Sequence, residues 1–125
     1  MNGLPADTDV SFLVGAELVQ VCIGQNEVIL HFLPAGDPTG PNPSITIESE
    51  VRLVNPDGAE FTLDTPVAIG PALLPLLRVP VTGAFAVPPG TLRLQLSSGH
   101  FLDVIDDSEA YESYTVTNGD RVIVV

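Results

Sequence analysis

Cys22 and His31 are the nucleophile and the imidazole that stand closest together in the sequence, and this pair could support covalent catalysis. A thiolate forms readily only when a neighbouring base or positive charge lowers the thiol pKa, and histidine is a common base for this purpose. In the hairpin predicted below, the two residues lie diagonally on one face, with backbones about 7 Å apart. No oxyanion donor or orienting third group accompanies them. A free cysteine that serves as a small buried side chain is the competing interpretation.

An acidic bend near the end of the chain could bind calcium or magnesium, because clustered carboxylates are the ligands of these cations. Its members are Asp103, Asp106, Asp107, Glu109 and Glu112. The spacing lacks the glycine and the regularly placed oxygens of an EF-hand loop, so we predict no metal and no cofactor. Asp106 and Glu109 instead have the spacing of a capping box, which predicts one helical turn before Tyr111. His100, beside a glycine at a turn, belongs to no metal-ligand set.

The chain is strongly acidic, with 16 Asp and Glu against 4 arginines, no lysine and a net charge of -12. This charge disfavours nucleic acid and anionic membranes as partners and favours a basic protein surface. Solubility is the more common reason for such a charge. The favoured function is a non-enzymatic binding or interaction domain, for example a small immunity or accessory protein. The predicted binding residues are exposed acids: Glu48, Glu50, Asp106, Asp107, Glu109 and Glu112. A small-molecule-binding or hydrolytic domain using the Cys22 and His31 face is the second hypothesis.

The length of 125 residues fits one domain with a core that needs no disulfide. A single cysteine excludes an internal disulfide, and the first residues contain neither a basic leader nor an apolar run of signal-peptide length. No apolar run reaches the roughly 18 residues of a membrane span. These features predict a cytoplasmic protein, and they leave open whether it is a monomer or a homodimer.

The elements that would position these side chains are mainly strands. Residues 17–24 and 27–33 predict a hairpin with Gln25 and Asn26 at its tip. Its register places six apolar residues on one face in three facing pairs: Ile23 with Val28, Val21 with Leu30, and Val19 with Phe32. A slip of one residue would scatter these side chains over both faces.

Residues 91–125 predict an antiparallel meander. Leu92, Leu94 and Leu96 alternate with polar residues, and the pair Asn118-Gly119 is typical of a two-residue hairpin loop. That loop would set Tyr114 opposite Ile123 and Val116 opposite Arg121, with a core face that consists of Tyr114, Val116, Ile123 and Val125. The last strand, residues 121–125, ends in four apolar residues. We expect it to lie in the centre of a sheet, and a dimer that covers its free edge is the alternative.

The middle of the chain predicts a mobile surface loop over residues 34–43, then one long strand over residues 44–54 that points Ile45, Ile47, Val51 and Leu53 inward. The sequence Asn-Pro-Asp-Gly at 55–58 predicts a tight turn. A short helical segment near residues 68–77 would start close to Pro71, with Pro75 either in its first turn or at a break. Residues 1–9 are predicted to be a loose leader, and residues 10–15 a turn that plugs the core.

The two halves of the chain follow the same order of strands and turns. The predicted fold is therefore mainly β and antiparallel, with two pseudo-repeated β-meanders around one core and one short helical segment near residues 68–77.

Several short stretches together resemble a family of small bacterial domains of unknown function, the DUF6188-like proteins. They are residues 13–24 (LVGAELVQVCIG), the apolar strand that ends at Phe32, the Ile47-Glu48-Ser49 strand, and residues 107–114 (DSEAYESY). The resemblance implies a β-rich fold and a bacterial origin. It implies no activity and no site residues.

Overall fold

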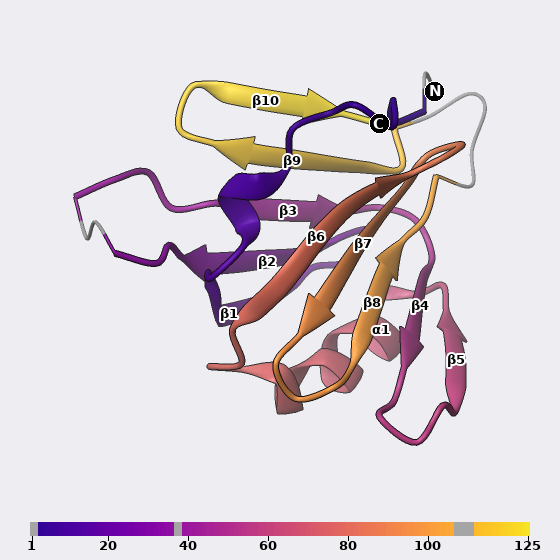
Figure 1. Ribbon diagram of the computed structural model, residues 1–125. Helices are drawn as coiled ribbons and strands as arrows, with labels where there is room; N and C mark the ends of the chain where they lie inside the picture. The colour runs from indigo at the N-terminus through magenta and orange to yellow at the C-terminus, as the bar shows by residue number, and fades with distance from the viewer. Residues whose placement is uncertain (1–2, 37–38, 107–111) are drawn as a thin grey trace.

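Ten strands form two five-stranded antiparallel sheets that face each other across one apolar core (Figure 1). The computed structural model describes residues 3–36, 39–106 and 112–125. Sheet A has the strand order β1-β2-β3-β9-β10, and sheet B has the order β5-β4-β8-β7-β6. The elements in chain order are η1 (Ser11–Leu13), β1 (Glu17–Ile23), β2 (Val28–Leu33), β3 (Ser44–Ile47), β4 (Val51–Val54), β5 (Glu60–Leu63), α1 (Pro66–Leu73), η2 (Leu74–Leu76), β6 (Val81–Val87), β7 (Thr91–Leu96), β8 (Phe101–Val104), β9 (Tyr114–Asn118) and β10 (Arg121–Val124).

Alternation of apolar and polar residues gives each sheet one face for the core. Across sheet A, one inner row runs through all five strands and consists of Val21, Leu30, Ile45, Val116 and Ile123. The matching row of sheet B consists of Ala84, Leu94, Leu102, Leu53 and Phe61. Facing side chains in neighbouring strands lie about 5 Å apart, so these rows continue from strand to strand as far as the edge strand β5, where Phe61 remains 48% exposed.

The predicted architecture is confirmed, and the structure adds how the two halves combine. Strands β1-β2-β3 form a meander in sheet A, while the following hairpin β4-β5 belongs to sheet B. Strands β6-β7-β8 form a meander in sheet B, while the following hairpin β9-β10 belongs to sheet A. Each strand of the first half therefore has its equivalent five strands later. The halves exchange their last hairpins, so neither sheet is built from one half alone.

This exchange corrects the prediction of one long strand over residues 44–54. The segment is two strands, β3 in sheet A and β4 in sheet B, joined by a crossing at residues 48–50. The inward residues were predicted correctly, because Ile45, Ile47, Val51 and Leu53 are all buried. Both sheets line the same core, so the alternation continues unchanged from one sheet into the other.

The register of the β1-β2 hairpin is confirmed from its tip to Gln20, with Ile23 opposite Val28 and Val21 opposite Leu30. A bulge between Leu18 and Gln20 then changes the pairing, and Phe32 lies opposite Leu18 where Val19 was expected. Leu18 is buried and Val19 is 45% exposed. An added residue in one strand turns the next side chain to the other face, which is what a bulge does.

The β9-β10 hairpin has the predicted faces but not the predicted register. Its loop is Gly119-Asp120, with Gly119 at a positive φ, so Val116 lies opposite Ile123 and the Tyr114 and Val125 backbones bond each other. The register differs from the prediction by two residues. Because side chains alternate with a period of two, this shift keeps the same residues on the core face.

The last strand, β10, lies at an edge of sheet A, so the prediction of a central position is wrong. Val125 and Ile123 face inward, whereas Val122 is 57% exposed. The four apolar residues in a row were the basis of that prediction. Half of them point to solvent on an edge strand.

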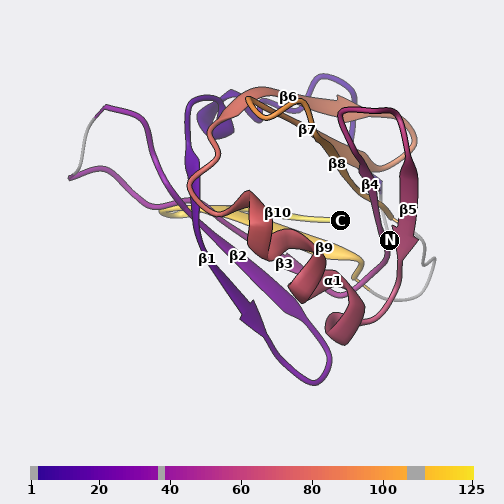
Figure 2. The same cartoon turned by 90° about the horizontal axis from the view of Figure 1, so that it is seen from below.

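Two segments fill the space between the sheets at their open sides. Helix α1 packs against β1 and β2 and, with η2, buries Ile69, Leu73 and Leu76; Figure 2 shows α1 between these strands and β5. The helix starts earlier than predicted, with Pro66 in its first turn and Pro71 inside it. Pro75 marks the change from α1 to the 3-10 turn η2, as expected of a break.

At the other open side, η1 packs against β6 and buries Leu13, which confirms the predicted plug at residues 10–15. The segment before it, predicted as a loose leader, contributes Leu4 to the core, and the Leu4 N–H bonds the Pro89 carbonyl at 3.2 Å. The predicted turn at 55–58 is present, with Gly58 at a positive φ and its N–H bonded to the Asn55 carbonyl. Neither α1 nor any other helix in the described ranges has the length and apolarity needed to cross a membrane.

Candidate functional site

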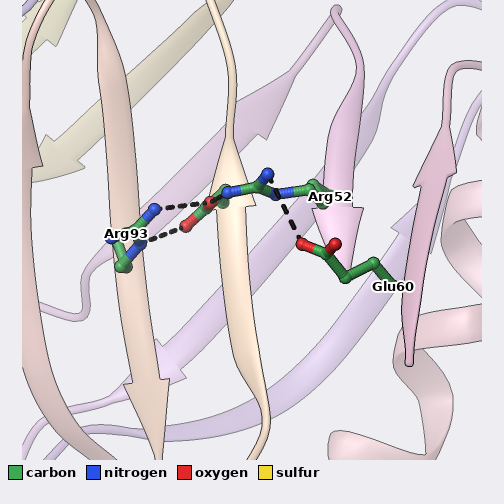
Figure 3. A network of polar contacts seen from close by, with 4 residues as sticks. Arg52, Glu60 and Arg93 are labelled. Atoms are coloured by element: carbon green, nitrogen blue, oxygen red, sulfur yellow. Dashed lines mark hydrogen bonds and ion pairs between the residues drawn. The ribbon is translucent and has the colours of Figure 1, made fainter. Parts of the chain in front are cut away.

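The outer face of sheet B carries a charged bridge of three residues from three neighbouring strands (Figure 3). Asp103 on β8 lies directly opposite Arg52 on β4 and Arg93 on β7. Arg93 donates from Nε to Oδ1 of Asp103 at 2.8 Å and from Nη2 to Oδ2 at 3.1 Å, and Arg52 donates from Nη2 to Oδ2 at 2.8 Å. Nη1 of Arg52 also lies 3.5 Å from Oε1 of Glu60 on β5. We refer to Arg52, Asp103 and Arg93 as the arginine-aspartate bridge.

Asp103 is only 2% exposed although it lies on the solvent side of the sheet, because the two guanidinium groups cover it. Burial acts to raise the Asp103 pKa, but hydrogen bonds from Arg93 and Arg52 outweigh it and hold the pKa below its ordinary value. The hydrogen bond to Asp103 likewise raises the pKa of Arg93. The lowered pKa keeps Asp103 ionised at neutral pH, and because guanidinium groups stay protonated in proteins, the bridge carries one more positive than negative charge.

An open hollow of about 200 Å³ lies beside the bridge. Its lining consists of Arg52, Arg93 and Asp103 together with Val54 and Phe101, which face each other across β4 and β8. The sequence indicates that Arg52 and Arg93 point outward, because they alternate with buried leucines. It gave no sign that β4 pairs with β8, and only that pairing brings both arginines to Asp103.

Four of the six predicted binding acids lie where the chain crosses between the two sheets. The Glu48 N–H donates to the Ser113 carbonyl at 2.8 Å, and the Ile105 N–H donates to the Glu50 carbonyl at 3.2 Å. These bonds lay residues 48–50 alongside residues 105–106 and 112–113. We refer to these three stretches as the acidic crossover. Glu48, Glu50, Asp106 and Glu112 belong to it, while the predicted Asp107, Glu109 and capped turn lie outside the described residues.

Within the acidic crossover, Glu48 and Glu112 are exposed and Glu50 is half-buried. Asp106 has an internal partner, since its Oδ1 accepts a hydrogen bond of 2.8 Å from the Ser113 hydroxyl. Throughout the described ranges, no three His, Cys, Asp or Glu side chains are grouped as metal ligands would be. The crossover therefore presents a negatively charged surface. Backbone hydrogen bonds between its stretches hold that surface in place.

Residues 13–125 match the model of a family described as a family of unknown function, DUF6188. The chain belongs to the DUF6188 family. Neither the curated proteins nor the solved structures contain a match to it. The matched range includes every strand of both sheets, so the DUF6188 domain is the pair of exchanged repeats. This agrees with the resemblance found in the sequence.

The second predicted site of this DUF6188 domain, Cys22 with His31, lies on the outer face of sheet A. Gln20 is opposite His31 and Cys22 is opposite Ile29, which gives the expected diagonal arrangement. Both side chains are half-buried. The hollow described above lies on sheet B and has neither residue in its lining.

His100 stands at the turn between β7 and β8 of the DUF6188 domain. Its Nδ1 lies 2.8 Å from the Ser98 hydroxyl, which is a local contact within the turn. The structure therefore gives His100 a partner of its own in the same turn.

Proposed function

We propose that this DUF6188 domain is a non-enzymatic binding domain whose acidic crossover engages a basic protein partner. The observation that carries the proposal is the pair of backbone hydrogen bonds, from Glu48 to Ser113 and from Ile105 to Glu50. These bonds bring carboxylates from two stretches that are distant in the sequence onto one ordered part of the backbone. Binding to a support that is already ordered loses less conformational entropy than binding to a loose acidic tail.

The distribution of arginines supports the same function. The chain has four arginines and no lysine, and the arginine-aspartate bridge holds Arg52 and Arg93 on the outer face of sheet B. Arg78 and Arg121 are the remaining cationic side chains, and Arg121 lies over the Phe12 ring at 5.5 Å. The exposed carboxylates of Glu48 and Glu112 can therefore attract a partner rich in lysine and arginine, and accelerate its association.

A small immunity or accessory protein that opposes a basic protein in the cytoplasm is one concrete form of this proposal. The hollow on sheet B has neither Cys22 nor His31 in its lining, so it gives no support to the alternative, a hydrolytic or small-molecule-binding domain that uses these two residues. We therefore propose the binding function alone.

The test is capture of the partner from the source cells by the tagged domain, followed by carbodiimide cross-linking, which joins carboxylates to lysines in contact with them. We expect cross-links at Glu48, Glu50 and Glu112. The double variant Glu48→Gln/Glu112→Gln should weaken binding at least about tenfold, since two exposed charges of the interface are removed. Rising salt concentration should weaken it further.

The control is Asp57→Asn/Asp120→Asn, which removes the same charge from two exposed positions in the β4-β5 and β9-β10 turns, outside the crossover. This variant should bind within about twofold of the unchanged protein. Equal losses in both variants would mean that only total charge matters and would contradict the proposal. Cross-links confined to other acids, or partners that are no more basic than the average protein, would contradict it too.

A further inference from the structure

The arginine-aspartate bridge leaves hydrogen-bond donors unused beside the hollow. A guanidinium has five N–H donors, and Asp103 takes two from Arg93 and one from Arg52. Within the described residues, Nε of Arg52 has no hydrogen-bond partner, but it is shielded from solvent, so a ligand would have to approach the other N–H groups of the two arginines. The side chains of Arg52 and Arg93 are 40% and 35% exposed, so both can be approached from solvent.

Two neighbouring arginines that can be reached from solvent are unusual in so acidic a chain. Asp103 neutralises one of two arginine charges, and its own position is fixed because it is held from both sides. The two guanidinium groups are consequently held near each other in a defined geometry. A planar pair of oxygens, as in a carboxylate, is the group that arginine binds best in this way.

A carboxylate of the protein itself already approaches the site. Oε1 of Glu60 lies 3.5 Å from Nη1 of Arg52, which is longer than a strong charge-assisted hydrogen bond of about 2.7 to 2.9 Å. The Glu60 side chain is 57% exposed and stands on the edge strand β5. Such a contact contributes little stability and is easily displaced. Glu60 would therefore compete only weakly with a carboxylate ligand for Arg52.

The remaining walls are apolar. Val54 and Phe101 face each other, and each lies two residues along its strand from Arg52 or Asp103. The hollow of about 200 Å³ is smaller than the roughly 300 to 1,000 Å³ of pockets that enclose drug-sized ligands. It suits a group of the size of one amino-acid residue, with an anionic end and an apolar body.

We propose that the hollow on the outer face of sheet B binds a carboxylate carried by a small apolar group, with Arg52 and Arg93 holding the carboxylate and Val54 and Phe101 contacting the apolar part. The site is separate from the acidic crossover, has the opposite charge preference and does not depend on the proposed protein partner. The same chemistry is present in a free apolar acid and in the last residue of a polypeptide chain.

The test is a titration followed by NMR of the arginine Nε–Hε signals in the intact protein. The probes are N-acetyl-leucine, its neutral amide N-acetyl-leucinamide, and an acetylated pentapeptide that ends in leucine with a free carboxylate. We expect N-acetyl-leucine to cause saturable shifts of the Arg52 and Arg93 signals and not of Arg78 and Arg121. The amide should bind at least about tenfold more weakly, since it lacks the charge that the arginines recognise.

Variants separate a built site from a general charge effect. Glu60→Gln removes the competing carboxylate and should strengthen binding of N-acetyl-leucine about threefold to tenfold, whereas Asp120→Asn, an equal charge change at an exposed position in the β9-β10 turn of sheet A, should leave it unchanged. Phe101→Ala should weaken binding about threefold to tenfold by removing part of the apolar wall. None of these changes touches Asp103, so the bridge persists.

Shifts that rise linearly without saturation, or that are equal for acid and amide, would overturn the proposal. An equal effect of Glu60→Gln and Asp120→Asn would overturn it as well. Saturation by the pentapeptide at lower concentration than the free acid would uphold the site and assign it to chain ends. The reverse order would uphold it and assign it to small acids.

Discussion

Asp103 shows how a carboxylate can be buried on the outside of a sheet. Arg52 and Arg93 cover it from the two neighbouring strands, and their hydrogen bonds hold its pKa below the ordinary value despite burial. We expect Asp103→Asn to lower the free energy of unfolding at pH 7 by about 1 to 3 kcal/mol, the range for lost hydrogen bonds to charged groups. The loss is limited because both arginines can turn to water. Urea denaturation measures it.

The pH dependence of this effect has a definite sign. A carboxylate with a lowered pKa in the folded state stabilises the protein above its unfolded-state pKa of about 3.9, and this stabilisation is lost as pH falls through the lower folded-state pKa. The stability difference between the protein and Asp103→Asn should therefore be constant near neutral pH and shrink below about pH 4. Asp64→Asn is the control, with little effect at pH 7. A difference that persists unchanged at low pH would contradict this account.

At the scale of elements, the edge position of β10 predicts an alternating pattern of hydrogen exchange. Tyr114 and Val125 exchange both backbone hydrogen bonds, so in this antiparallel pair the Ile123 N–H also points to β9, while those of Val122 and Val124 point away from it. We expect slow exchange at Ile123 and Val125, and fast exchange at Val122 and Val124. Amide exchange followed by NMR at low protein concentration measures it.

The same measurement at several protein concentrations tests for a dimer. If a second copy pairs along the free edge of β10, Val122 and Val124 become protected as the concentration rises. Slow exchange at all four residues, independent of dilution, would contradict the edge position of the strand.

At the scale of the whole molecule, the exchanged hairpins make the two halves depend on each other. Without the second half, β3 loses its neighbour β9, β4 loses its neighbour β8, and the core faces of both are exposed. We expect a fragment of residues 1–64 to be unfolded as a monomer and to regain dispersed amide signals when mixed with residues 65–125. NMR and sedimentation measure these states.

A dimer of the first fragment would agree with the exchange, because each copy could supply the hairpin that the other lacks. A folded monomer of residues 1–64 would contradict it. The full chain should unfold in one transition, since neither sheet is complete without strands from both halves.

Strands, faces and tight turns could be read from the sequence because they depend on neighbouring residues. Alternation placed Ile45, Ile47, Val51 and Leu53 in the core, and the turn at 55–58 followed from its proline and glycine. The core face of the last hairpin was correct even though its register was two residues off, because side-chain direction repeats every two residues. The sequence also indicated the two repeats and the exposure of Glu48 and Glu112.

Tertiary structure alone decided which strands are neighbours. Residues 44–54 alternate in the same way whether they form one strand or cross between two sheets, because both sheets face one core. For the same reason, the sequence did not predict the edge position of β10, the hydrogen bond between Glu48 and residue 113, or the bridge of Arg52, Asp103 and Arg93. Pairing between strands that are distant in the chain depends on how all strands together cover the core. Local alternation of apolar and polar residues does not determine that arrangement.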